Sequence, residues 1–311
     1  MPEEKTSPSR RVLLRTAAQF GFNLAITAFD VQHKASAGPP NPHAPPLEDR
    51  NSNRSLPRRR LGRTNMMVTT IGSGGAGITG PEILLRAIEK GINYIDTAPA
   101  YGHSEDVFGE VMQTTARDQV FLATKWAVYG DWTAARCLAS LHRSLKRLKT
   151  DHIDLMQLHS VDTGPGLKGT PRDGFVRLDS PALHKAMETA RRDGMVRYFG
   201  VTSHDPKRKA LLIHAIDTGL FDAIQVAFNA DDYAVSGMPE LLAYAHRRDI
   251  GVIGREASAD TKPAGTSGLA AVTAELAWML SKGIATVVNA ETVFSEDSQD
   301  ACLAAARQNR P

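Results

Sequence analysis

From about residue 68 onward, short apolar runs alternate with longer segments in which apolar residues recur every three or four positions. The short runs have the length and composition of buried strands, and the longer segments have the spacing of helices that bury one face. The predicted strands are 68–72, 93–96, 120–124, 152–158, 196–201, 223–226, 251–254 and 286–288. Eight pairs of strand and helix in alternation predict an α/β protein of the (β/α)8 TIM barrel class.

The chain before the first barrel strand divides into three parts. Residues 60–72 contain two strand-like runs around Asn65, and asparagine tolerates left-handed turn backbone, so we predict an N-terminal β-hairpin. Residues 38–57 are rich in proline, asparagine and charge and lack apolar periodicity, which predicts a disordered linker. The barrel domain is therefore expected to span residues 58–311, after a separate segment at residues 1–37.

The segment 1–37 has the features of an export signal. It contains a sequence that resembles the bacterial twin-arginine motif, Ser9-Arg10-Arg11-Val12-Leu13-Leu14-Arg15, then a mildly apolar stretch and a small-residue cleavage pattern, Ala35-Ser36-Ala37. The apolar stretch is shorter than the ~20 residues of a spanning helix, so we expect no stable membrane anchor. We predict the twin-arginine export machinery as a partner and a periplasmic or exported location. The alternative is an amphipathic N-terminal helix in a cytoplasmic protein.

The net charge and the cysteine content argue against a nucleic-acid-binding protein and against a metal-binding protein. The net charge is +3, and the first 37 residues contribute +2 of it, so the remaining chain carries +1. A nucleic-acid partner is not expected at that charge. The two cysteines, Cys137 and Cys302, are far apart and have no CxxC pattern or histidine cluster beside them, so we expect no metal site.

Four polar residues fall at or just beyond the carboxyl ends of the second, third and fourth predicted strands. Asp96 ends one strand and Tyr101 follows it in a turn, while Lys125 and His159 come at the ends of the next two strands. The carboxyl ends of all barrel strands meet at one mouth, where the active sites of this fold lie. We therefore predict that Asp96, Tyr101, Lys125 and His159 are catalytic.

At this point the sequence resembles the aldo-keto reductase family, which uses an Asp, Tyr, Lys and His in this order and at these strand ends. The matching stretches are RRLGRTNMMVTTIGSGG, GINYIDTAPAYGHSE, FLATK, DHIDLMQLH, GVTSH and IQVAFN. They occur in family order between about Arg59 and Asn229, and the match past Ile250 is poor. The resemblance implies a barrel whose bottom is closed by the N-terminal hairpin.

The four residues suit carbonyl reduction by hydride transfer. Negative charge develops on the carbonyl oxygen, and Tyr101 is suited to give the proton, although a phenol with a pKa near ~10 is a poor acid unless tuned. Lys125 is expected to lower the pKa of Tyr101, because an adjacent ammonium favours the phenolate. Asp96 is expected to hold Lys125 charged and in place, and His159 to orient and polarise the carbonyl.

The resemblance also implies a nicotinamide dinucleotide. Thr202 and Ser203 fall where the family often has Ser-Asn, and Gln225 matches a family glutamine on the sixth strand; all three positions hydrogen-bond the nicotinamide carboxamide. Asp96 is also assigned to the cofactor site. The usual cofactor of the family makes NADP(H) the expected cofactor, with NAD(H) as the alternative.

The C-terminal part departs from the family pattern. Family members that bind the 2'-phosphate of NADP usually have Arg or Lys after strand eight, whereas residues 289–293 contain no base and include Glu291. A carboxylate there repels a phosphate but accepts a hydrogen bond from a ribose hydroxyl. Lys262 and Arg255 are the candidates to supply the missing positive charge.

These observations predict an NAD(P)-dependent oxidoreductase that interconverts a small aldehyde or ketone and its alcohol. The loop at residues 160–178 is expected to shape the substrate pocket, because βα loops set specificity on this fold. One alternative is an NAD-dependent sugar (aldose) dehydrogenase. Another, from a different class, is a non-catalytic binding or regulatory barrel whose cofactor site has degraded.

Overall fold

The computed structural model describes residues 45–114, 117–126, 133–165, 171–230, 233–255 and 269–308. The predicted export segment, the first part of the predicted linker and Lys262 lie outside these residues. Within the described ranges, no helix combines the length and the apolar character needed to cross a bilayer.

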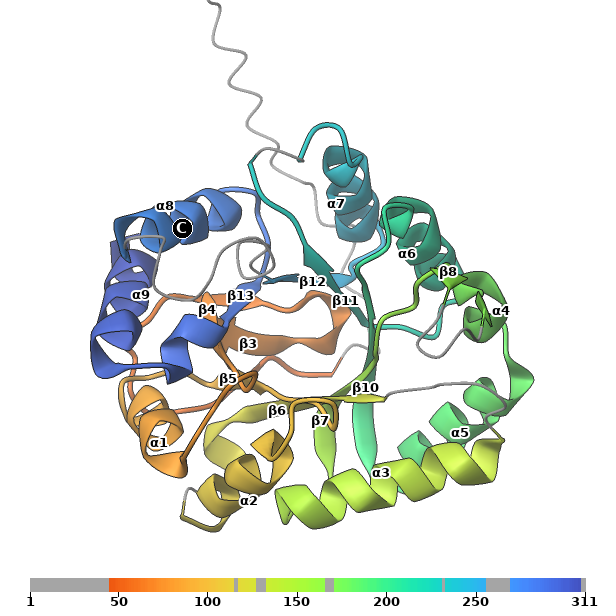
Figure 1. Cartoon of the computed structure of the whole chain (residues 1–311), viewed down its shortest axis with the longest axis horizontal. Helices are drawn as coiled ribbons and strands as arrows, with labels where there is room; N and C mark the ends of the chain where they lie inside the picture. Colours follow the sequence, from red (N-terminus) through yellow and green to blue (C-terminus); the bar gives the residue numbers. More distant parts are fainter. Residues whose placement is uncertain are drawn as a thin grey trace, which may run out of the picture. The chain divides into compact units, whose positions relative to one another are not determined.

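Eight parallel strands close into a barrel (Figure 1). Their order around the barrel follows their order in the chain, and the last strand pairs with the first. The strands are β4 (Ile71–Gly74), β5 (Tyr94–Asp96), β6 (Phe121–Trp126), β7 (Ile153–Leu158), β10 (Val196–Ser203), β11 (Ala223–Ala227), β12 (Gly251–Arg255) and β13 (Thr286–Asn289). The predicted fold class is confirmed, and each predicted strand overlaps one of these.

A ring of helices surrounds the barrel, with one main helix after each strand and a further short helix, α4 (Gly174–Leu178), between β7 and α5 (Figure 1). The main helices are α1 (Pro81–Glu89), α2 (Ser104–Thr114), α3 (Ala134–Leu148), α5 (Pro181–Arg192), α6 (Arg208–Asp217), α7 (Met238–Arg247), α8 (Leu269–Leu280) and α9 (Glu296–Gln308). The ends of α3 show how sequence sets the boundaries: the Thr133 hydroxyl accepts a hydrogen bond from the Arg136 N–H, and Lys149 adopts left-handed backbone with φ of 50°. Both are common helix caps.

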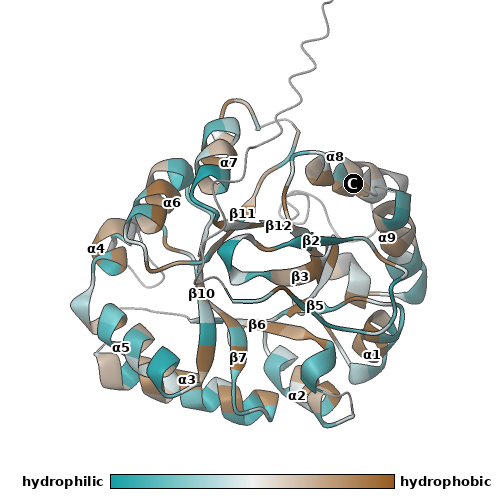
Figure 2. Cartoon of the chain, turned by 180° about the vertical axis from the view of Figure 1, so that it is seen from behind, coloured by the Kyte–Doolittle hydropathy of each residue, from teal (hydrophilic) through white to brown (hydrophobic). Residues whose placement is uncertain are grey.

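A small sheet closes the bottom of the barrel. In it β2 (Arg58–Arg60) pairs antiparallel with β3 (Met66–Thr69), and the turn between them passes through Asn65 at φ 56°. In Figure 2, β2 and β3 lie across the middle of the ring of strands. The predicted hairpin is thus present. The predicted strand at residues 68–72 is wrong as a single strand, because the chain divides at Thr70 between β3 in this sheet and β4 in the barrel.

Residues 45–57, which the composition assigned to a linker, lie against the barrel. Within them β1 (Glu48–Asp49) pairs parallel with β3, and Arg50 contacts the fully buried Asp154 at 3.0 Å. Arg117 and Arg197 reach the same carboxylate at 2.7 and 2.6 Å. Burial by itself raises the pKa of Asp154, but the attraction of Arg117 and Arg50, together with a hydrogen bond from the Leu122 N–H, outweighs burial and lowers the pKa. The polar segment is ordered because its charged groups are paired with residues distant in the sequence.

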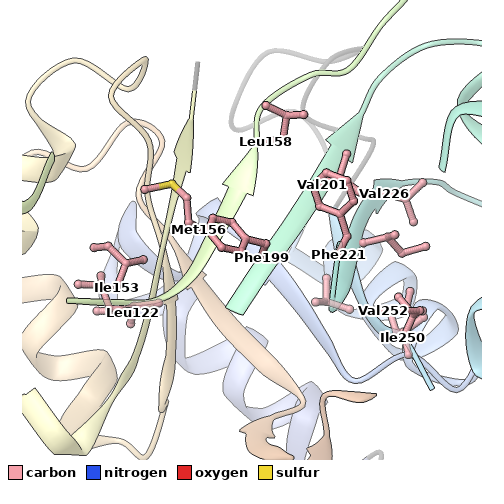
Figure 3. Packing of buried hydrophobic residues seen from close by; sticks show 14 of the residues in the cluster. Leu122, Ile153, Met156, Leu158, Phe199, Val201, Phe221, Val226, Ile250 and Val252 are labelled. Atoms are coloured by element: carbon pink, nitrogen blue, oxygen red, sulfur yellow. The ribbon is translucent and has the colours of Figure 1, made fainter. Parts of the chain in front are cut away.

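The apolar core forms two layers. The outer layer joins strands to helices and includes Met156 and Leu158 from β7 and Phe199 and Val201 from β10 (Figure 3). The inner layer fills the barrel with side chains such as Tyr94, Phe121, Leu155 and Ala223, together with Leu61, Met66 and Val68 from the closing sheet. Side chains alternate between the two layers along a strand, and this alternation positions the site described next.

Candidate active site

The site residues continue the inner face of the barrel beyond its apolar layer. Alternate residues of a strand face the same side, so counting in twos from the inner-layer side chains identifies the next inward-facing residues. These are Asp96 on β5, Lys125 on β6, Gln157 on β7, His159 just past β7, Thr202 on β10 and Gln225 on β11. All six are at least nine-tenths buried. The strand register places Lys125 directly beside Gln157. The barrel therefore gathers these polar groups at its carboxyl-end mouth.

Asp96 and Lys125 form a buried ion pair. The Lys125 ammonium donates hydrogen bonds to Oδ1 of Asp96 and to the carbonyl oxygen of Thr97, the latter at 3.0 Å, and both charged side chains are only 2% exposed. Burial by itself lowers the pKa of Lys125, but attraction to Asp96 and Tyr101 outweighs burial, so that the net shift is upward. Lys125 therefore stays charged at neutral pH.

Tyr101 lies in the turn between β5 and α2. Gly102 follows it at φ 58°, in the left-handed region that favours glycine, and this turns the chain into α2. The Tyr101 ring centroid is 4.9 Å from the Lys125 ammonium nitrogen. The ring also meets the His159 ring edge-on, with centroids 5.9 Å apart and planes at 90°. The structure thus brings all four predicted catalytic residues together.

His159 is held as a neutral ring. Its side chain is 8% exposed, and its Nδ1 has no hydrogen-bond partner among the described residues. Burial, reinforced by the positive charges of Lys125, His204 and Arg255, lowers its pKa from 6.5 to about 3. A neutral imidazole keeps one N–H donor and one acceptor nitrogen, so the ring has a single N–H group that can donate a hydrogen bond at neutral pH.

Glu105 fixes the start of α2, just after Tyr101. Its carboxylate is 1% exposed, accepts hydrogen bonds from the Thr124 hydroxyl and the Arg147 guanidinium, both at 2.7 Å, and forms an ion pair with Arg147. Thr124 immediately precedes Lys125 on β6, so Glu105 couples the Tyr101 turn to the strand that carries the lysine. The sequence interpretation did not single out Glu105; its signal was a carboxylate on the buried side of an amphipathic helix.

Of the three residues predicted to bind the carboxamide, two face the mouth. Thr202 and Gln225 lie on the inner face, whereas Ser203, one residue further along β10, lies on the opposite face. The Ser203 hydroxyl contacts the carbonyl of Val161 and the carboxylate of Asp162, at 3.2 and 3.0 Å. Ser203 therefore anchors the loop after β7.

Thr202 and Gln225 also have protein partners. The Thr202 hydroxyl oxygen accepts a hydrogen bond from the Ser160 N–H at 2.8 Å, which leaves its own hydrogen to donate. The Gln225 side-chain amide lies 3.4 Å from Oδ2 of Asp96. Gln157, which the sequence interpretation missed, donates to that same oxygen at 2.5 Å. Gln157 could have been found from the two-residue spacing to His159 on one strand.

The chemistry of this group of side chains is limited. Among the described residues, no three His, Cys, Asp or Glu side chains are grouped so that they can hold a metal ion. The group instead combines a phenol, a buried ammonium and a neutral imidazole around one opening. Such a set can donate a proton and stabilise negative charge on an oxygen.

Comparison with known proteins gives partial matches. The chain is 35% identical over 166 residues to the uncharacterized oxidoreductase YqkF of Bacillus subtilis, covering 48% of this chain and 49% of that protein. It is 28% identical over 214 residues to L-galactose dehydrogenase of Arabidopsis thaliana, covering 63% of each. It is 33% identical over 135 residues to NADPH-dependent codeinone reductase 1-1 of Papaver somniferum, covering 40% of this chain and 41% of that one. The matches thus span about half the length of these relatives.

The match to solved structures covers more of the chain. A thermostable aldo-keto reductase crystallised with the inhibitor epalrestat superposes with a TM-score of 0.63 at 26% identity, over 80% of this chain and 93% of that one. The sequence profile of the aldo/keto reductase family matches residues 80–261, which is more than half of the chain. The chain belongs to the aldo/keto reductase family.

Proposed function

We propose that this protein interconverts an aldehyde or ketone and the corresponding alcohol, with a nicotinamide dinucleotide as the hydride carrier. One observation carries the proposal: the Tyr101 ring lies beside the charged Lys125, 4.9 Å away, and edge-on to the neutral His159 ring, 5.9 Å away. A proton donor, a fixed positive charge and a hydrogen-bond donor thus surround one point at the mouth. Family membership supports the same reaction class.

In the reducing direction, each residue has one role. The Tyr101 hydroxyl gives its proton to the carbonyl oxygen as negative charge develops there. The Lys125 ammonium, held by Asp96, stabilises the charge that this transfer leaves on the Tyr101 oxygen. The neutral His159 ring donates its N–H to the carbonyl oxygen and orients it. In the oxidising direction, Tyr101 accepts the alcohol proton.

The residues present fit the nicotinamide end of the cofactor. None of the described side chains at the site can reduce a carbonyl by itself, and the nicotinamide, when bound, supplies the hydride. The Thr202 hydroxyl and the Gln225 amide both face the mouth and would hold the carboxamide, while Asp96 at the base of the site fixes the lysine. The assignment of Ser203 to the carboxamide rests on the family resemblance alone, since its hydroxyl is bonded to the loop after β7.

We propose NADP(H) as the cofactor, with NAD(H) as the alternative. A relative named as an NADPH-dependent reductase supports NADP(H). The sequence after β13 supports the alternative, because residues 289–293 contain no Lys or Arg. Assaying a panel of aldehydes and ketones with NADPH and NADH in parallel tests the proposal. Turnover of a carbonyl substrate with either cofactor supports the reaction class, and no turnover with both refutes it.

Two other functions have specific support. The relative named L-galactose dehydrogenase favours an NAD-dependent sugar dehydrogenase. If this alternative is correct, the protein should oxidise aldoses with NAD faster than it reduces carbonyl compounds. The poor match to the family past Ile250, including the lack of Lys and Arg in residues 289–293, favours a non-catalytic barrel. In that case neither dinucleotide changes the fluorescence of Trp126 or Trp278 on titration.

We also propose that the N-terminal segment directs export through the twin-arginine machinery. The support is the Ser9-Arg10-Arg11 motif with its apolar stretch and small-residue pattern. Cell fractionation of the wild-type protein and of a variant with Arg10→Lys and Arg11→Lys tests it. Export of the wild type alone is expected, and retention of both forms in the cytoplasm contradicts it.

A further inference from the structure

The Asp96 carboxylate is held on both of its oxygens. Oδ1 faces the Lys125 ammonium, and Oδ2 accepts a hydrogen bond from the Gln157 amide at 2.5 Å. Gln225 approaches the same Oδ2 at 3.4 Å, which is a weaker contact. Gln157 is completely buried. The strongest contact to the second carboxylate oxygen therefore comes from a residue outside the Asp, Tyr, Lys and His set.

The orientation of the Gln157 amide follows from this contact. An ionised carboxylate only accepts hydrogen bonds, so only the NH2 group of Gln157 can face it. Its Oε1 points elsewhere and has no hydrogen-bond partner among the described residues. Leaving a buried amide oxygen without a partner is energetically unfavourable. The amide thus keeps its donor on Asp96 although its acceptor has no described partner.

The backbone leaves Gln157 little freedom to move. It is paired in register with Lys125 on one side and with Gly200 on the other. A β-carbon at Gly200 would lie 3.0 Å from Cγ of Gln157, so glycine at this position makes room for the side chain. Gln157 is therefore packed between two strands with its amide fixed toward Asp96.

We infer that Gln157 is a positioning residue: by holding Oδ2 of Asp96, it keeps Oδ1 on Lys125 and so fixes the ammonium beside Tyr101. A carboxylate attached by a single bond rotates easily, because its terminal torsion has broad minima. A donor fixed at one oxygen prevents that rotation. This inference rests on the proposed function of the same site, and it adds Gln157 as a fourth residue to the chain of contacts that runs through Asp96 and Lys125 to Tyr101.

The decisive variant is Gln157→Glu, which has nearly the same shape. While the new carboxyl is protonated, its O–H donates to Asp96 as the amide did, and turnover stays within about threefold of wild type. Two carboxylates at hydrogen-bonding distance cannot both ionise without strong repulsion. As the pH rises and the shared proton is lost, the variant is expected to lose at least tenfold in kcat relative to wild type between pH 6 and pH 9, with substrate KM little changed.

Two further variants complete the test. Gln157→Met keeps the volume without a donor and is expected to lower kcat by a similar factor at all pH values. Gln119→Glu makes the same charge change in the turn before β6, where Gln119 accepts a hydrogen bond from the exposed Ser52 N–H, and is expected to keep the wild-type pH profile. A wild-type pH profile and wild-type kcat in both Gln157 variants overturn the inference.

Unfolding by urea separates this inference from the proposed function. A carboxyl pair that shares a proton in the folded state binds more protons than the unfolded chain, so the stability of Gln157→Glu relative to wild type should fall as pH rises. If that fall is seen without a change in kcat, Gln157 contacts Asp96 but does not position Lys125, and the inference is wrong. If the wild type turns over no carbonyl substrate, the proposed function fails, and the inference fails with it although the stability slope remains.

Discussion

The neutral state of His159 gives a quantitative prediction about pH. The pKa of this histidine falls from 6.5 to about 3 on folding, chiefly because the ring is buried and secondly because Lys125 is close. The folded protein therefore binds fewer protons than the unfolded chain at pH values below about 6.5. The contribution to stability is fully present above that pH and is lost progressively as the pH falls toward about 3.

The magnitude follows from the two pKa values. At pH 5 the unfolded histidine is almost fully protonated while folded His159 is almost fully neutral, so acidification from pH 7 to pH 5 removes about 2 kcal/mol from the free energy of unfolding. Other groups also titrate in this range. The comparison must therefore be made with a variant, His159→Asn, that cannot take up this proton.

Urea unfolding of both proteins at pH 7 and pH 5 measures the effect. The wild type is expected to lose about 2 kcal/mol more than His159→Asn over this interval. His142→Asn, on the exposed side of α3, serves as the control and should behave as wild type. Equal losses in wild type and His159→Asn would show that His159 is protonated in the folded state, which contradicts its assigned role as a neutral hydrogen-bond donor.

Two further predictions concern buried charges. Asp154→Asn should destabilise the protein by about 3 kcal/mol, since the three arginines that pair with Asp154 would keep their charges without their common partner. The midpoint of urea unfolding measures this loss. An unchanged midpoint would contradict the explanation given for why residues 45–57 lie against the barrel. Arg147→Met should also cost about 3 kcal/mol, because it leaves the buried Glu105 carboxylate without its cation. Adding Glu105→Gln should recover part of that loss, and no recovery would show that packing, not charge, holds α2 to α3.

The strands and the grouping of the candidate site residues at the barrel mouth were predictable because they depend on local patterns. Residues such as Asp96 and Lys125 end apolar runs, and the topology of a parallel barrel brings those ends together without further information. Gln157 was equally accessible, since it lies two residues before His159 on the same strand. The assignment of Ser203 was transferred from the family position, and in the structure this residue lies on the opposite face of β10 from the inward Thr202, with its hydroxyl bonded to the loop after β7.

The segment at residues 45–57 was not predictable from its composition. Its polar residues include Asn51, which is buried, and Arg50, which is partly buried, because partners far along the chain satisfy their polar groups. The Asn51 amide, for example, donates to the carbonyl of Ile88 at 2.7 Å. Hydrophobic periodicity does not record such long-range pairing, so a polar sequence with buried partners has the same appearance as a linker.

The central claim is that Tyr101 transfers the proton during hydride exchange, and Tyr101→Phe tests it most directly. This variant keeps the ring beside Lys125 and His159 and removes only the hydroxyl. With a carbonyl substrate identified in the substrate panel, kcat is expected to fall by about 10²- to 10⁴-fold, the usual contribution of a general acid. The dissociation constant of the dinucleotide, measured by fluorescence, is expected to stay close to that of wild type. A variant that retains the wild-type kcat would contradict the claim.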